Sequence, residues 1–131
     1  MLMRPAFDGH DVVYVTTLEG LAEQFNASPA ELIPDCTRSE KRMAAQAPLA
    51  LLGVLLRHRP HVIVSTGALP GVIALGLGRR MGARTVWVDS VANAEDISMS
   101  GKLAKRFAHL WMSQWPHVAE DAGAVYAGAV L

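Results

Sequence analysis

Short, continuously apolar runs alternate with longer mixed segments along this chain. Runs rich in β-branched residues cover residues 12–16, 61–65 and 84–88. Because they are apolar at every position, they predict strands that are covered on both faces of a sheet. Weaker patterns predict further strands near 32–33, at 110–113 and at 125–126, whereas 18–38 reads mainly as loop because of its prolines and small polar residues.

A long helix is predicted from Glu40 to His58, with Ser39 as its N-cap. It is apolar nearly all round after Met43, which predicts a helix that is buried or lies against an apolar surface. Ala47–Leu56 is the longest apolar stretch, but it is half of the roughly 20 residues that cross a bilayer and it contains Pro48. The sequence therefore predicts peripheral membrane contact at most.

A second helix is predicted to begin at Pro70, which suits the first helical position, and to end at Arg79 and Arg80 before Gly82. A short amphipathic helix is expected over 101–109, with apolar side chains on one face and cations around the other. Its apolar residues are Leu103, Phe107 and Leu110. This helix either packs on the sheet, which we favour, or lies on an anionic lipid leaflet.

Alternation of buried strands and helices predicts a Rossmann-like, doubly wound and mostly parallel α/β sheet. With 131 residues, of which 51% are hydrophobic, we expect a single domain over 1–131. The lone Cys36 has no internal disulfide partner, so a reducing, cytoplasmic compartment is the expectation.

The charges exclude one class of function. Twelve Lys and Arg balance 12 Asp and Glu, so we expect no nucleic-acid partner held by a basic excess. Charge is nevertheless distributed unevenly, because five arginines and no acid lie between Arg57 and Arg84. The five histidines have no metal-like spacing, and the chain has neither a Walker lysine nor the three-glycine dinucleotide pattern, so neither metal nor cofactor is expected.

Ligands of doubly wound sheets bind beyond the carboxyl ends of the strands, and two segments with unusual composition are predicted there. In Ser65–Gly71, glycines let the backbone approach a ligand, and N–H groups at the following helix would favour an anion such as a diphosphate. Asp89–Asn93 places a carboxylate, a hydroxyl and an amide after a strand, where they could bind a sugar or phosphate. The alternative for both segments is a local turn.

Several segments in fixed order resemble the oligosaccharide-biosynthesis subunit of two-component UDP-sugar glycosyltransferases, of the bacterial capsule and exopolysaccharide type. The resemblance extends from about His10 to Leu131. It is carried by Asp11–Thr16, Ile33–Cys36, Arg59–Ala68, Trp87–Asn93, Ser98–Leu103 and Gln114–Pro116.

The resemblance implies the amino-terminal half of a GT-B glycosyltransferase on a chain of its own. That half binds a lipid-linked sugar acceptor at the cytoplasmic face of the cell membrane and recruits a donor-binding subunit that holds the UDP-sugar, with transfer of a hexose or N-acetylhexosamine such as that of UDP-N-acetylglucosamine. It also implies which residues line the acceptor side of the site and which lie toward the partner subunit. The former are Thr66, Gly67, Ala68, Gly71, Ser90 and Asn93, with Asp89 as the catalytic candidate; the latter are Gln114, Trp115 and Pro116.

The chain departs from the family pattern in one respect. In the family, a Gly-Gly-His loop carries a candidate catalytic histidine. This sequence has no such loop, and His10 does not lie at the position of that histidine. We therefore expect the first strand to be absent, through a late start codon or a truncated copy, and activity only together with a second subunit. The alternatives are a self-sufficient small transferase that uses Asp89 as a general base, and a phosphate-binding α/β module without a transferase role.

Overall fold

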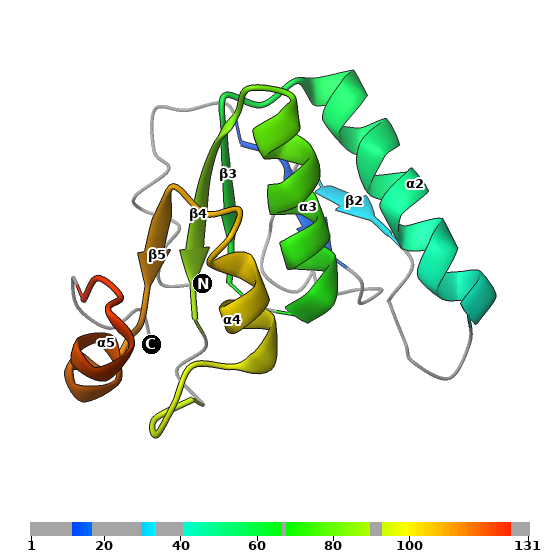
Figure 1. Cartoon of the computed structure of the whole chain (residues 1–131). Helices are drawn as coiled ribbons and strands as arrows, with labels where there is room; N and C mark the ends of the chain where they lie inside the picture. The colour runs from blue at the N-terminus through cyan, green and yellow to red at the C-terminus, as the bar shows by residue number, and fades with distance from the viewer. Residues whose placement is uncertain (1–11, 17–29, 34–40, 67, 90–92, 127–131) are drawn as a thin grey trace. The chain divides into compact units, whose positions relative to one another are not determined.

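A computed structural model describes residues 12–16, 30–33, 41–66, 68–89 and 93–126 (Figure 1). The chain divides into two compact units, residues 1–58 and 59–131, and each unit is described by itself. The expectation of one domain over 1–131 remains a prediction.

The described residues of the first unit form a two-stranded parallel sheet and one long helix. Strand β1 (Tyr14–Thr16) pairs with β2 (Ala30–Leu32), and Tyr14 lies opposite Ala30. Helix α2 spans Lys41–His58. All three elements were predicted to within two residues, whereas the proposed N-cap Ser39 and the segment around Cys36 lie outside the described residues.

Helix α2 was predicted to be buried or to lie against an apolar surface, and its described side chains are in part buried and in part exposed. Its side chains at Leu51, Val54 and Leu55, which have i, i+3, i+4 spacing, are buried. Leu49 and Leu56, however, are 71% and 52% exposed. Burial of all its apolar side chains within this chain is thus not found, and the alternative, contact of the exposed ones with another apolar surface, remains a prediction.

The second unit is built on a three-stranded parallel sheet in the order β3–β4–β5. Strand β3 is Val62–Ser65, β4 is Arg84–Val88 and β5 is Leu110–Met112. The predicted last strand at 125–126 is reduced to an isolated parallel bridge between Met112 and Val125. Strands β1 and β3 belong to different sheets.

Two helices cover one face of this sheet. Helix α3 (Ala68–Arg80) connects β3 to β4, and α4 (Met99–Ala104) lies beside α3 (Figure 1). Helix α3 begins two residues before the predicted start at Pro70, which its first turn tolerates because N–H groups there have no acceptor within the helix. It ends as predicted before Gly82, whose φ is +88°.

The short helix differs from its prediction over 101–109. It begins two residues earlier, ends at Ala104, and buries the small residues Gly101 and Ala104. Leu103 is 51% exposed and Leu110 belongs to β5, so of the predicted apolar face only Phe107 packs against the core.

Helix α5 (Pro116–Ala122) was not predicted. The signals for it are proline at the first helical position and Gly123 in the left-handed conformation at the end. A helix of seven residues is too short for apolar periodicity to reveal it.

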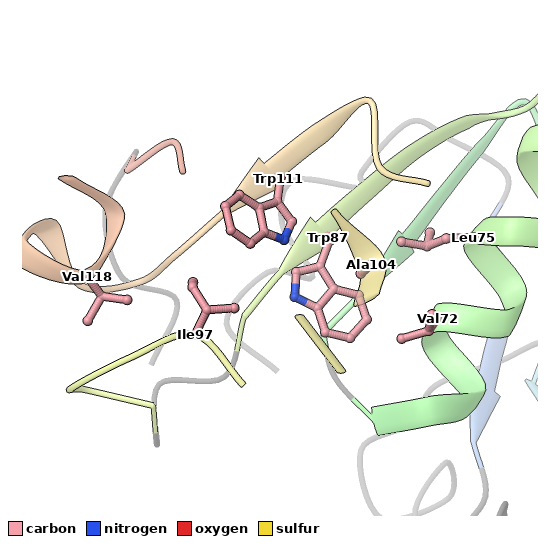
Figure 2. Packing of buried hydrophobic residues seen from close by; sticks show 7 residues of the cluster. All are labelled: Val72, Leu75, Trp87, Ile97, Ala104, Trp111 and Val118. Atoms are coloured by element: carbon pink, nitrogen blue, oxygen red, sulfur yellow. The ribbon is translucent and has the colours of Figure 1, made fainter. Parts of the chain in front are cut away.

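Two tryptophans form the centre of the core in this unit. Trp87 on β4 is fully buried and Trp111 on β5 is 9% exposed. Aliphatic side chains from the elements around them complete the cluster that Figure 2 shows: Val72, Leu75, Ile97, Ala104 and Val118. The parallel sheet and its covering helices confirm the predicted Rossmann-like α/β class. Within the described residues, no helix has both the length and the apolar character that crossing a bilayer requires.

Candidate functional site

The carboxyl ends of β3 and β4 meet at one edge of the sheet. The two strands are parallel and Ser65 lies opposite Trp87, so Thr66 and Asp89, each directly beyond its strand, are at the same edge. This confirms that the two polar segments begin at neighbouring strand ends, although Gly67, Ser90 and the rest of 90–92 lie outside the described residues.

Asp89 points into the domain rather than into an open crevice. Its side chain is 1% exposed, and three donors surround its carboxylate. Trp87 Nε1 donates to Oδ1 at 3.2 Å, Ser98 N to Oδ2 at 3.0 Å and Ser98 Oγ to Oδ1 at 2.6 Å. Buried carboxylates are stable when donors satisfy them in this way. Asp89 is thus a buried, hydrogen-bonded carboxylate at the strand end, and its role as the catalytic candidate remains a prediction.

Ser98 connects this carboxylate to the start of α4. It is the N-cap of the helix, with extended backbone, and its Oγ accepts from Gly101 N at 2.9 Å while donating its own proton to Asp89. One hydroxyl therefore fastens the helix start to the strand end.

Gly101 is required by the tightness of this packing. A Cβ at Gly101 would lie 2.6 Å from Ile97 Cγ2 and 2.7 Å from Asp89 Oδ1. The main-chain oxygen of Gly101 accepts from Trp111 Nε1 at 2.8 Å, so the same residue also contacts β5.

Gln114, which follows β5, also hydrogen-bonds to Asp89. Its side chain is 7% exposed, and Nε2 donates to the main-chain oxygen of Asp89 at 2.9 Å. Gln114 was expected to lie toward a partner; its side chain instead contacts the interior of this unit. Trp115 is half-buried as the N-cap residue of α5, and Pro116 is exposed, so these two remain the surface candidates of that motif.

The other predicted acceptor-side residues have different environments. Thr66 is exposed and Asn93 is half-buried. Ala68 is the first residue of α3. A side chain at Gly71 would overlap Ser65 Oγ and approach Trp87, so close packing of α3 against the sheet requires glycine there. A role for these residues in acceptor binding remains a prediction.

The segment between Asn93 and Ser98 is held from two further elements. His117 Nε2 of α5 hydrogen-bonds to Ala94 O. Lys102 Nζ of α4 forms an ion pair with Asp96 Oδ2 at 2.9 Å. The hydrogen bond from Lys102, together with the one from the main-chain N–H of Ile97, holds the pKa of the Asp96 carboxyl below its ordinary value.

Sequence reasoning identified Asp89 but missed the side chains that surround it. Trp87 could have been placed on the same face as Asp89 from strand alternation, since they are two residues apart. Ser98 stands before a predicted helix, which is an N-cap signal. Its nine-residue separation from Asp89 gives no local sign of their contact. Within the described residues, no cluster of His, Cys, Asp and Glu could bind a metal ion.

The fold is similar to that of a solved structure. The crystal structure of MurG from Acinetobacter baumannii superposes with a TM-score of 0.76 over 98% of this chain and 40% of that chain, at 12% identity. This similarity, together with the parallel sheet, assigns the chain to the Rossmann-like class found in GT-B glycosyltransferases.

At the level of sequence, the chain is similar to two proteins described as UDP-N-acetylglucosamine transferase subunit ALG14. The one from Eremothecium gossypii is 37% identical over 91 residues, which cover 63% of this chain and 41% of that protein. The one from Yarrowia lipolytica is 36% identical over 70 residues, or 49% of this chain and 32% of that protein. The chain thus matches less than half of either relative's length. No family model matches the chain.

Proposed function

We propose that this chain is the acceptor-binding, partner-recruiting subunit of a two-component UDP-sugar glycosyltransferase. The observation that carries the proposal is the 37% identity over 91 residues to a protein described as a transferase subunit. The MurG-like fold supports it, because open α/β sheets bind their ligands beyond the carboxyl ends of the strands. The donor is proposed to be UDP-N-acetylglucosamine, held by a separate subunit.

The contacts of Asp89 favour a subunit over a self-sufficient enzyme. A general base must be within hydrogen-bond reach of the proton it removes. Both carboxylate oxygens of Asp89 already accept from Trp87 or Ser98, and the side chain is 1% exposed. We therefore propose that Asp89 positions the edge of the sheet by holding Ser98, and that it does not take a proton from the acceptor.

The acceptor is proposed to be a sugar linked to a lipid through a diphosphate, in the synthesis of a polysaccharide or a lipid-linked oligosaccharide. Thr66 and Asn93 are proposed to contact it, since one is exposed beyond β3 and the other follows β4 at the same edge. Trp115 and Pro116 are proposed to face the donor-binding subunit. The chain is proposed to act peripherally at the cytoplasmic face of the membrane.

The test is transfer of radiolabelled N-acetylglucosamine from its UDP donor to a lipid-diphosphate-linked sugar. The chain, a donor-binding subunit encoded in an adjacent reading frame, and the two together are assayed separately. We expect transfer only by the pair. Turnover by the chain alone would support the self-sufficient enzyme, and an acceptor that binds no better than inorganic phosphate would support the plain phosphate-binding module.

The role of Asp89 is tested in the active pair by Asp89→Asn, with Ser98→Ala as the matched variant. If Asp89 only positions Ser98, both variants should raise the KM for the acceptor more than they lower kcat. The acid limb of the pH profile should then keep its shape. A base would give a different result: Asp89→Asn alone would lower kcat by at least about 100-fold and remove that limb.

A further inference from the structure

Helix α4 packs in the opposite sense to that expected of an amphipathic helix. It buries its small residues Gly101 and Ala104 against the sheet. Its large apolar side chains are outside: Met99 is 74% and Leu103 is 51% exposed. Residues four apart lie on the same side of a helix, so these two side chains form one exposed apolar strip on α4.

Cations accompany this strip. Lys102 and Arg106 are both exposed, one within α4 and one in the turn after it. We call Met99, Lys102, Leu103 and Arg106 together the α4 face. Residues 95–106 contain three lysines and arginines and two acids, Glu95 and Asp96, of which Asp96 is paired with Lys102.

We propose that the α4 face is where this chain contacts an anionic phospholipid bilayer, Met99 and Leu103 entering the headgroup region and Lys102 and Arg106 remaining at its phosphates. Apolar side chains surrounded by cations suit this environment, because the carbons leave water while the charges meet anionic lipid.

The size of the α4 face favours a bilayer over a protein partner. A stable protein interface covers about 800 Å² on each side. Two apolar side chains on a convex six-residue helix are few for such an interface, whereas peripheral membrane contact needs only a few inserted side chains and a matching charge.

The position of the α4 face agrees with the proposed function, on which its biological purpose rests. Ser98, the N-cap of α4, holds Asp89 at the carboxyl edge of the sheet, so Met99 begins the helix at that same edge. A lipid-linked acceptor whose chain stays in the bilayer would then present its diphosphate next to this edge.

The experiment is co-sedimentation of the full chain with vesicles of phosphatidylcholine alone and of phosphatidylcholine with an equal part of phosphatidylglycerol. We expect binding to the anionic vesicles that weakens with salt. Met99→Ser with Leu103→Ser should lower the partition coefficient by about tenfold, which corresponds to partial loss of two apolar insertions. Because both side chains are exposed, the double variant should keep the melting temperature of the parent chain.

Matched controls come from the opposite edge of the sheet. Met81, in the turn between α3 and β4, is 40% exposed, and Arg84 at the start of β4 is exposed. Met81→Ser should leave vesicle binding unchanged, and Arg84→Gln should weaken it less than Arg106→Gln does. Unchanged binding of the Met99, Leu103 double variant, or loss of binding in Met81→Ser instead, overturns the proposal.

A protein partner at the α4 face would give a different result. The double variant would then lose association with the donor-binding subunit and keep vesicle binding, which also overturns the proposal. Transfer to an acceptor in detergent micelles should survive in the double variant. If the proposed function is wrong, the unaltered pair of subunits will show no transfer.

Discussion

A methyl group on Gly101 would lie 2.7 Å from Asp89 Oδ1, a separation closer than real Cβ atoms tolerate. The Asp89 carboxylate cannot move away easily, because hydrogen bonds from Ser98 and Trp87 hold it. Gly101→Ala should therefore lower the free energy of unfolding by about 1–3 kcal/mol or more, as overpacking of a close-packed site does. Urea unfolding measures the change.

Gly76 provides the control for that prediction. It lies within α3, and a Cβ there would meet only Phe107 ring carbons at 3.7 Å or beyond, which is ordinary contact. Gly76→Ala should be neutral or stabilising by up to about 1 kcal/mol, because alanine favours the helix. If both substitutions had the same effect, the close approach of Gly101 to Asp89 would not be the cause.

Substitutions at Thr85 test a second contact, between β4 and the residues just before β5. Its Oγ1 donates to Phe107 O at 2.5 Å and accepts from His109 N at 3.1 Å, and the residue is fully buried. Thr85→Val keeps the shape but leaves the partly buried main-chain oxygen of Phe107 without this donor, so it should cost about 1–3 kcal/mol.

Thr85→Ser should cost less than Thr85→Val, since it keeps the hydroxyl and loses only a methyl group. A core in which packing alone mattered would give the reverse order, because valine is nearly isosteric with threonine. Thermal unfolding of the two variants side by side distinguishes the two explanations.

Gly82 is expected to resist substitution for a reason of backbone conformation alone. Its φ is +88°, and nothing lies within 4 Å of where a Cβ would be. Gly82→Ala should cost about 1 kcal/mol through left-handed strain, and Gly82→Asn should cost less, because asparagine tolerates that region better. Equal stability of the alanine variant and the parent would contradict this account of the end of α3.

The Asp96–Lys102 pair predicts a measurable pKa. Lys102 and the N–H of Ile97 lower the pKa of Asp96 in the folded chain. The ion pair therefore stabilises the fold at pH values above the unfolded-state pKa of Asp96, and this stabilisation is lost as the pH falls through the lowered pKa. Lys102→Met should raise the pKa of Asp96 toward its ordinary value, as carboxyl-carbon NMR titration would show. Lys105→Met is the control, because Lys105 Nζ lies over the Trp111 ring, 4.9 Å from its centroid.

The strands and long helices could be predicted because continuous apolar runs and terminal signals are local. The run at 84–88 became β4, and the arginine pair before Gly82 marked the end of α3. Prediction was wrong where burial depends on neighbours distant in sequence. Leu103 has the pattern of a core residue yet is exposed, since Gly101 and Ala104 bring the opposite side of α4 against the sheet.

The candidate site shows the same division. Asp89 could be placed at a strand end, because that position follows from the apolar run before it. The direction of its side chain could not be predicted, since its partners include Ser98, nine residues later, and Gln114 reaches its main-chain oxygen from 25 residues away. Likewise, the glycine pattern at 65–71 indicated an approach to a ligand, while Gly71 is explained by contact with Ser65.

The double engagement of the Ser98 hydroxyl has a consequence for how this sheet edge can diverge among related proteins. Asp89, directly after β4, and Ser98, directly before α4, are joined by hydrogen bonds of 2.6 and 3.0 Å, so the two ends of the connection between them are held together. Exchanges at the exposed Glu95 of that connection can therefore change the surface of this edge while β4 and α4 keep their places, whereas exchanges at the buried Ile97 cannot.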